Sequence, residues 1–255
     1  MLQLAIDAGN TDIVFGLHDG VQWLHHWRMP SKTPPTKEAW HYRLVSELLE
    51  LERKPSEIKQ TIISSVVPPL TAPLGEMAHQ VMGVAPLVLD ANLFPRLKVK
   101  VLNTEEIGAD LVANAMAAYD LVQHKCVVVD FGTALTFTTI GADGTIMGVA
   151  IAPGLKTAIR ALFDNTAQLP EVPLEEPASV LGNDTIQAIQ AGVVVGYTGM
   201  VKYMLHQIKL EIGEDCKTIA TGGLSSVLTG LSEDFDYHDR MLTMNGLILI
   251  ARDCG

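Results

Sequence analysis

Two short turns in the chain combine a carboxylate, a glycine and a hydroxyl, a set of groups that suits phosphate binding. The first is Asp7-Ala8-Gly9-Asn10-Thr11 and the second is Asp130-Phe131-Gly132-Thr133. A glycine lets the backbone approach a ligand closely, while hydroxyl, amide and backbone N–H groups donate hydrogen bonds to it. A single Asp-x-Gly turn is common in ordinary hairpins. Two such turns that face each other across a cleft would form a clamp for phosphate.

Each turn joins two strands of a three-stranded unit, and this unit occurs twice. Apolar runs predict its strands: 2–6, 13–17 and 21–24 in the first copy, and 126–129, 135–140 and 145–151 in the second. Asp19-Gly20 and Asp143-Gly144 supply the hairpin turns. The copies begin about half a chain apart, which predicts a duplicated fold of two α/β domains rather than an array of short repeats. We expect these domains to span residues 1–114 and 115–255.

The segments between and after the two units alternate between helices and strands, as is typical of α/β domains. Periodicity predicts helices over 36–52, 70–82, 155–163, 182–212 and 240–252, and strands over 61–67, 87–89 and 218–221. We expect Thr36 to cap the first of these helices and Pro68-Pro69 to stop the strand that precedes them. Gly222-Gly223 either admits a flat ligand close to the backbone or forms a plain turn, and Leu224-Ser225 is expected to start a helix.

Three glycines recur at helical spacing within the long helical stretch, at Gly192, Gly196 and Gly199. Because glycine lowers helix propensity, their presence favours close packing against another element, such as a helix of a second subunit. A break of the helix near Gly199 is the alternative.

A carboxylate lies on a helix that is otherwise almost entirely apolar. Residues 107–119 contain only two polar side chains before Tyr119, Asp110 and Asn114, which are four residues apart and share one face. We expect Asn103 or Thr104 to cap this helix. A buried carboxylate costs free energy unless it has partners or a function. Asp110 is therefore either a first-turn residue satisfied by backbone N–H groups or a general base that faces the cleft.

Composition narrows the class of protein. The 255 residues carry a formal net charge of −11, only 18 Lys and Arg, and 48% hydrophobic residues. We therefore expect a well-buried core and neither nucleic acid nor membrane as a partner. Three widely spaced cysteines favour a reducing cytoplasm over a disulfide scaffold. The Walker-A, GxGxxG and GxSxG motifs are absent from the sequence, so any phosphate chemistry rests on the two Asp-x-Gly turns.

Several strings, in this order along the chain, resemble the type III pantothenate kinase family. They are Ile6-Asp7-Ala8-Gly9-Asn10-Thr11, Ser64-Ser65-Val66-Val67-Pro68-Pro69, Gly108-Ala109-Asp110, Asp130-Phe131-Gly132-Thr133-Ala134, Ala152-Pro153-Gly154-Leu155, Thr166-Ala167-Gln168-Leu169-Pro170, Gly182-Asn183-Asp184-Thr185 and Ala220-Thr221-Gly222-Gly223-Leu224. The resemblance implies a duplicated actin-like (ribonuclease H-like) two-domain kinase fold and a homodimer. It also implies ATP-dependent phosphorylation of pantothenate to 4'-phosphopantothenate, the first step of coenzyme A biosynthesis.

The resemblance also implies roles for individual residues. Those expected to bind the ATP phosphates are Asp7, Ala8, Gly9, Asn10, Thr11, Asp12, Ile13, Val14 and Thr133. Asp110 becomes the base that takes the proton from the substrate hydroxyl, and Asp130 a ligand of K⁺ or NH₄⁺. The pantothenate site comprises Gly108, Ala109, Asp110, Leu111 and Thr185. Two carboxylates in a cleft for polyphosphate would repel it without cations, so Mg²⁺ is expected with the nucleotide.

Two residues depart from the family pattern. The family usually has arginine at the position of Leu111 and tyrosine at the position of Val101, and both help to hold the substrate. The alternatives to an active pantothenate kinase are therefore a non-catalytic accessory or regulatory homologue and a kinase of another small hydroxylated metabolite. Against loss of catalysis stands the retention of Asp7, Asp110, Asp130, Thr133 and Thr185.

Overall fold

The computed structural model describes residues 1–32, 36–166, 169–170, 172–223, 225 and 228–255. Contacts divide the chain into two compact units: Met1–Ala117 with Thr243–Gly255, and Ala118–Leu242. The last residues, Thr243–Gly255, thus belong to the same unit as the first residues of the chain. The predicted domain ranges 1–114 and 115–255 do not include this feature. Those domain ranges stay a prediction.

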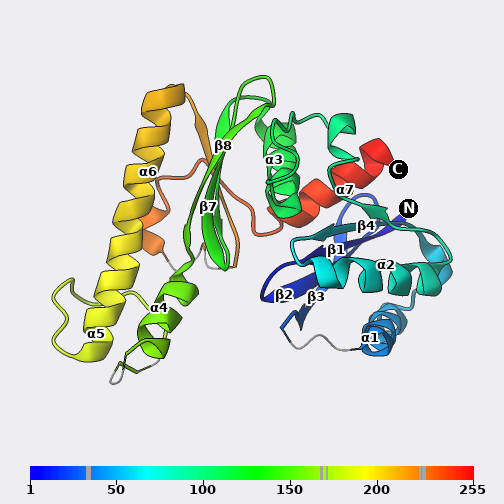
Figure 1. Cartoon of the computed structure of the whole chain (residues 1–255), viewed down its shortest axis with the longest axis horizontal. Helices are drawn as coiled ribbons and strands as arrows, with labels where there is room; N and C mark the ends of the chain where they lie inside the picture. Colours follow the sequence, from blue (N-terminus) through cyan, green and yellow to red (C-terminus); the bar gives the residue numbers. More distant parts are fainter. Residues whose placement is uncertain (33–35, 167–168, 171, 224, 226–227) are drawn as a thin grey trace. The chain divides into compact units, whose positions relative to one another are not determined.

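The first unit is built on a mixed five-stranded sheet (Figure 1). Its strands are β1 Leu2–Ala8, β2 Asp12–His18, β3 Trp23–Pro30, β4 Ile58–Ser65 and β5 Leu87–Val88, in the order β3-β2-β1-β4-β5. β1 pairs antiparallel with β2 and parallel with β4. The predicted third strand begins two residues later than expected and runs on to Pro30, because Trp23 and residues 25–30 pair with β2.

Two helices cover one face of this sheet: α1 Lys37–Glu50 and α2 Pro68–Met82 (Figure 1). Thr36 caps α1 as predicted, and its side chain accepts a hydrogen bond from the Ala39 N–H. Pro68 and Pro69 do more than follow the strand: they form the first turn of α2, where a missing N–H costs nothing. Leu4, Ile6 and other alternate residues of β1 are fully buried beneath the helices.

The second unit repeats the sheet of the first. Its strands are β6 Cys126–Phe131, β7 Ala134–Ile140, β8 Ile146–Pro153, β9 Lys217–Thr221 and β10 Tyr237–His238, in the order β10-β9-β6-β7-β8. β6 pairs antiparallel with β7 and parallel with β9, as β1 does with β2 and β4. The same order and directions occur in both units, which confirms the predicted duplication.

Helices of the second unit pack their apolar residues on its sheet. They are α4 Leu155–Asp164, α5 Thr185–Gln190, the π-helical segment η3 Ala191–Val195 and α6 Gly196–Ile212. The last three run on without interruption, so the break considered near Gly199 does not occur. Three short 3₁₀ segments also occur among the described residues: η1 Pro55–Glu57 and η2 Phe94–Arg96 in the first unit, and η4 Thr229–Leu231 in the second.

Two further helices, α3 Ala109–Val122 and α7 Leu242–Cys254, meet in the first unit through Gly246. A methyl group on Gly246 would run into the carbonyl oxygen of Ala113, so only glycine allows this approach. Thr243 also donates a 2.8 Å hydrogen bond to the buried Asn114 side chain. These contacts explain why the last helix groups with the first unit.

None of the helices in the described part of the chain is both long and apolar enough to cross a membrane.

Candidate functional site

The first turn begins at Asp7, the next-to-last residue of β1. In the register of the sheet Asp7 lies beside Ser64 of β4, while the preceding pair, Ile6 and Ile63, packs into the helix-covered core. Because side chains alternate along a strand, Asp7 and Ser64 face the other side of the sheet. Asp7 is therefore a half-buried carboxylate outside the apolar core.

Hydrogen bonds within the unit fix the shape of this turn. The Gly9 N–H donates to Asp12 O at 3.0 Å, and the Ser31 N–H donates to Thr11 O at 2.9 Å. The Ser31 hydroxyl also donates to Gly9 O at 2.6 Å. Asn10 and Thr11, at the tip, are exposed. Sequence reasoning missed Ser31, because only the pairing of β2 with β3 brings it to the turn.

Ile13 and Val14, also predicted to bind phosphate, support the turn from the neighbouring strand. Ile13 and Val14 belong to β2 and pair with Ala8 and Asp7 of β1. Ile13 is fully buried, so its side chain belongs to the core. Both residues hold the two ends of the turn together.

The start of α3 lies beside the first turn. The Val66 N–H donates to Ala8 O at 3.1 Å. The segment that follows β4 therefore lies alongside the turn. A methyl group on Gly108 would lie 3.4 Å from the Val66 side chain and would run into the Asp110 carboxylate. The structure thus brings the Asp7 turn and the segment from Gly108 to Leu111 together in one unit.

Asp110 is the second residue of α3, because the helix begins at Ala109 rather than after Asn103 or Thr104. The Leu111 and Val112 N–H groups bond to Gly108 O, while Asn103 bonds to Glu106, so the predicted caps were wrong. The Leu111 N–H also donates to Asp110 Oδ1 at 2.8 Å.

Burial nevertheless raises the pKa of Asp110, against the lowering effect of its backbone hydrogen bonds. Asp110 is thus a first-turn residue that accepts a backbone hydrogen bond, as one of the two alternatives predicted. Its backbone hydrogen bonds do not offset the free-energy cost of burying the carboxylate. A carboxylate with a raised pKa is a better proton acceptor than an ordinary one, which suits a general base.

The second turn resembles the first, although its glycine N–H bonds to the carbonyl oxygen two residues on rather than three. The Gly132 N–H donates to Ala134 O at 3.1 Å, and the Gly154 N–H donates to Thr133 O at 3.0 Å. The Thr157 hydroxyl on α4 donates to the same Thr133 oxygen at 2.7 Å. Thr133 itself is exposed at the tip. Asp130 and Thr133, predicted as neighbours, are thus held in one rigid turn.

Asp130 is surrounded by polar groups at the end of β6. Its register partners are Thr136 on β7 and Thr221 on β9, both buried. The Thr136 hydroxyl has no hydrogen-bond partner among the described residues. Gly222 has a φ of +90°. A methyl group on it would lie 2.5 Å from Asp130 Oδ1. Of the two alternatives for Gly222-Gly223, the backbone of Gly222 therefore favours a turn, because it packs against Asp130.

The remaining predictions concern Thr185, Leu111 and Ser225. Thr185 is the exposed first residue of α5, whose cap Asp184 accepts the Gln187 N–H at 2.8 Å. Leu111 is only 8% exposed. Ser225 lies in a turn rather than at a helix start. The expectations that fall on Ala167, Gln168 and Leu224 lie outside the described residues.

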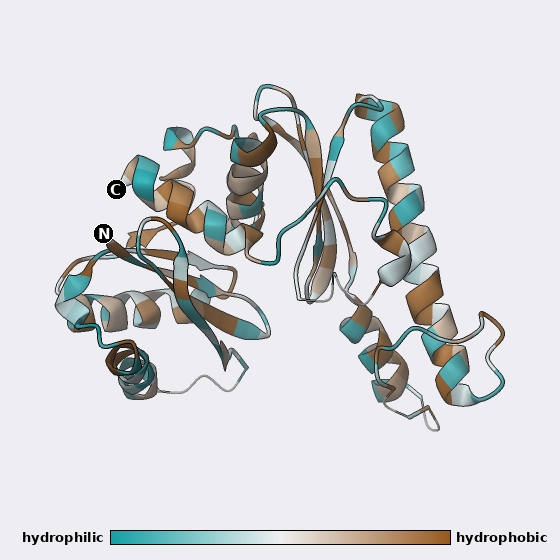
Figure 2. Cartoon of the chain, turned by 180° about the vertical axis from the view of Figure 1, so that it is seen from behind, coloured by the Kyte–Doolittle hydropathy of each residue, from teal (hydrophilic) through white to brown (hydrophobic). Residues whose placement is uncertain are grey.

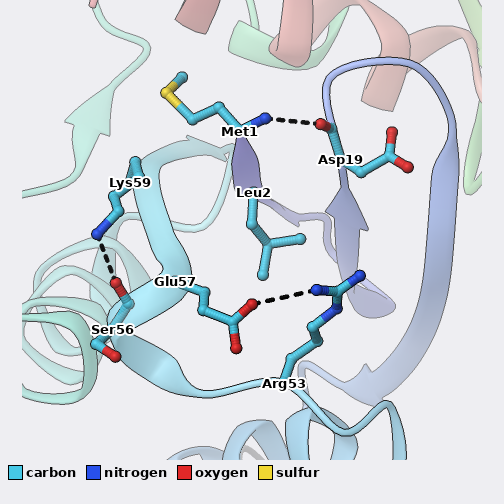
Figure 3. Close-up of a pocket in the computed structure, with 7 residues that line it drawn as sticks. All are labelled: Met1, Leu2, Asp19, Arg53, Ser56, Glu57 and Lys59. Atoms are coloured by element: carbon cyan, nitrogen blue, oxygen red, sulfur yellow. Dashed lines mark hydrogen bonds and ion pairs between the residues drawn. The ribbon is translucent and has the colours of Figure 1, made fainter.

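A separate pocket lies at the opposite end of β1, lined by Met1, Leu2, Asp19, Arg53, Ser56, Glu57 and Lys59 (Figure 3). Its cationic groups are bound within it. Arg53 pairs with Glu57 at 3.2 Å, Lys59 bonds to Ser56 O at 2.8 Å, and the amino terminus bonds to Asp19 O at 2.9 Å (Figure 3). This pocket contains none of the predicted site residues.

Known proteins resemble the chain over nearly its whole length. A family model described as "Type III pantothenate kinase" matches residues 3–207. A relative named "Type III pantothenate kinase" from Hyphomonas neptunium is 37% identical over 250 residues, which cover 96% of each chain.

Solved structures show the fold. A ROK family glucokinase from Streptomyces griseus in complex with glucose and AMPPNP gives a TM-score of 0.53 at 14% identity, and covers 99% of this chain and 98% of its own. The activator of the 2-hydroxyisocaproyl-CoA dehydratase from Clostridium difficile with bound ADPNP gives 0.54 at 10% identity, with 99% and 95% covered. This likeness confirms the predicted duplicated actin-like fold.

Proposed function

The chain belongs to the type III pantothenate kinase family, an ATP-binding transferase of coenzyme A biosynthesis that phosphorylates pantothenate, and we propose that Asp110 and the two Asp-x-Gly turns carry this reaction. The observation that supports the proposal best is the position of Gly108, which lies against both the Val66 side chain and the Asp110 carboxylate, while the Val66 N–H bonds to Ala8 O in the turn that Asp7 begins. A candidate base and a candidate phosphate site are thus neighbours within one unit. Phosphoryl transfer needs mainly positioning and charge neutralisation, which such a site can supply.

In this proposal the chain's own groups have distinct tasks. Asp110 accepts the proton from the primary hydroxyl of pantothenate, and its raised pKa makes it a stronger base for that step. The residues from Asp7 to Val14, together with Thr133, hold the ATP phosphates. Gly108, Ala109, Leu111 and Thr185 contact pantothenate.

Cations are needed because Asp7 and Asp130 would otherwise repel the phosphates. Mg²⁺ enters with the nucleotide and neutralises phosphate charge. Asp130 fits a monovalent cation, K⁺ or NH₄⁺, because the buried Thr136 hydroxyl beside it in the sheet has no hydrogen-bond partner among the described residues. A carboxylate and a neutral oxygen together suit such an ion.

A single assay tests the proposed activity against its alternatives. ADP release is measured with ATP, Mg²⁺, K⁺ and pantothenate, and then with other small hydroxylated metabolites in place of pantothenate. We expect release with pantothenate only. Release with another metabolite alone would indicate a different kinase, and tight pantothenate binding without ADP release would indicate an accessory protein.

We place the protein in the cytoplasm, a location that its cysteines support. Cys126, Cys216 and Cys254 are buried free thiols. Burial raises the pKa of Cys126 to about 12 and that of Cys216 to about 11, so both stay protonated and unreactive.

Leu111 is expected to weaken pantothenate binding. Arginine at this position would give one or two charge-assisted hydrogen bonds of about 1.5–3 kcal/mol each, equivalent to at least a tenfold change in KM. We therefore expect a working kinase with a high KM for pantothenate, and a KM at least about tenfold lower in Leu111→Arg. Because Leu111 is 8% exposed, the larger side chain should also lower the melting temperature.

Steady-state kinetics and thermal unfolding measure both effects. Leu111→Met, which nearly conserves volume, is the matched control and should change neither value appreciably. Tight pantothenate binding by the natural chain would show that another residue replaces the arginine.

We also propose that the protein is a homodimer formed through α6. Gly192, Gly196, Gly199, Tyr203, His206 and Leu210 follow one another at spacings of four and three residues and are all exposed. Hydrophobic and hydrophilic stretches follow each other along this helix (Figure 2). Tyr203 and Leu210 are 64% and 60% exposed, which is unusual for apolar residues on one helical stripe. Such a stripe is typical of helices that pack against a partner helix.

Gly196→Leu should weaken the dimer. A methyl group on Gly196 meets no atom of the described chain within 4 Å, so the substitution should leave the fold of the subunit intact. In a close helix contact between subunits, the same side chain would overpack the interface. Sedimentation at micromolar concentration should show twice the chain mass for the natural protein and a shift towards the monomer for the variant. Glu211→Leu, outside the stripe, is the control; a natural protein that is an active monomer would contradict the proposal.

A further inference from the structure

The two Asp-x-Gly turns are closed from behind by corresponding segments. The segment after β3 begins with Ser31, and the segment after β8 begins with Gly154. In each segment this first residue donates its backbone N–H to the carbonyl oxygen of a threonine in the turn. Ser31 donates to Thr11 O at 2.9 Å, and Gly154 donates to Thr133 O at 3.0 Å. The residues just before them also correspond, because Pro30 pairs with Asp12 and Pro153 with Ala134.

Each segment also supplies one hydroxyl to a carbonyl oxygen of its turn. The buried Ser31 donates to Gly9 O at 2.6 Å, and Thr157 donates to Thr133 O at 2.7 Å. The second hydroxyl cannot come from position 154. A methyl group there would run into Gly132 O and lie 2.6 Å from Thr133 O. Thr157, three residues on in the first turn of α4, reaches the same oxygen instead.

We propose that Ser31 and Thr157 are positioning residues that hold the two turns in the form that binds the phosphates of ATP. This inference rests on the proposed function, since it takes the turns to be the phosphate sites. Neither hydroxyl needs to touch ATP, because each acts through a backbone carbonyl.

Peptide geometry explains how a bond behind the turn affects its front. The carbonyl and the following N–H of a trans peptide point in opposite directions. When Ser31 holds Gly9 O, the N–H of Asn10 is directed away from Ser31; when Thr157 holds Thr133 O, the N–H of Ala134 is directed away from Thr157. Without the hydroxyl the turn must be ordered when the ligand binds, and that ordering weakens affinity.

The test compares ATP affinity in variants of the full chain. Calorimetric titration with ATP and Mg²⁺ gives Kd, and steady-state kinetics give the KM for each substrate. Ser31→Ala and Thr157→Val should each raise the Kd and KM for ATP about three- to tenfold, the effect of one hydrogen bond, with the KM for pantothenate within about twofold. Thr157→Ser keeps the hydroxyl and should restore natural affinity. Ser56→Ala, at the opposite end of the first sheet, is the control.

Three results would overturn the inference: unchanged ATP affinity in both variants, a Thr157→Ser variant as weak as Thr157→Val, or a parallel rise of both KM values with a lower melting temperature. The last would indicate a merely structural role. Failure of the proposed function is distinguishable, because a chain that binds ATP but releases no ADP still allows the affinities to be compared. A natural chain that binds no ATP would overturn both.

Discussion

Asp110→Asn should lower kcat by roughly 10²–10⁴-fold, the usual contribution of a general base. The amide keeps the size of the side chain but cannot accept the substrate proton. The KM for ATP should change little, because the residue does not belong to the phosphate turns. Asp120→Asn, on the same helix, is the matched control and should keep near-natural turnover. A variant of Asp110 with near-natural turnover would assign the proton transfer elsewhere.

The same substitution should not destabilise the fold, which separates a catalytic from a structural role. Burial raises the pKa of Asp110 in the folded chain above that in the unfolded chain. Protonation therefore stabilises the fold, and this contribution is lost as pH rises through the folded-state pKa. Above the folded-state pKa the charged carboxylate costs stability, so at such a pH the melting temperature of Asp110→Asn should equal or exceed that of the natural protein.

Activity should fall on the acid side as Asp110 becomes protonated. Because the pKa is raised, this fall should lie at higher pH than for an ordinary aspartate. The pH profile of kcat measures it, and the acid limb should be absent from the residual activity of Asp110→Asn.

Asp130→Ala should lower activity by about 10²-fold, the size expected when one electrostatic contact to developing charge is removed. The natural enzyme should need K⁺ or NH₄⁺ and work poorly with Na⁺, and the residual activity of the variant should no longer distinguish the ions. ADP release measured in each chloride salt at equal ionic strength tests this.

Two further variants sharpen the cation experiment. Thr136→Val removes the neighbouring buried hydroxyl but keeps the carboxylate, so it should raise the K⁺ concentration needed for half-maximal rate. Asp143→Asn removes a carboxylate of the β7–β8 hairpin, where Asp143 accepts bonds from Thr145, and should leave the cation response unchanged. Equal rates of the natural enzyme in Na⁺ and K⁺ would contradict a selective site at Asp130.

Local patterns in the sequence were sufficient to predict the three-stranded units and their turns. Alternation of apolar residues and the hairpin residues Asp19-Gly20 and Asp143-Gly144 act over a few neighbours, and the structure forms both units there. The cap of α1 at Thr36 is equally local. Repetition of the unit then implied the duplicated fold, because each copy must form the same sheet.

Errors arose where a distant segment determines the local structure. Asn103 and Thr104 are good caps by type, but α3 begins only at Ala109, where Gly108 packs against Val66, the residue that follows β4. The glycines Gly192, Gly196 and Gly199 were expected to pack against another element, and because none of them meets a described atom of its own chain within 4 Å, their packing against a second subunit stays a prediction. Spacing along a helix indicates a face but does not say what covers it.

The types of the chemical groups were therefore readable from the chain itself, because carboxylate, glycine and hydroxyl lie within single turns. Only the tertiary structure decided what supports them. Ser31 reaches Gly9 through the pairing of β2 with β3, and Thr157 reaches Thr133 because Gly154 leaves no room for a nearer side chain. Asp110 gains its raised pKa from its burial in the folded chain. These properties depend on contacts between strands and helices, and no spacing within one segment encodes them.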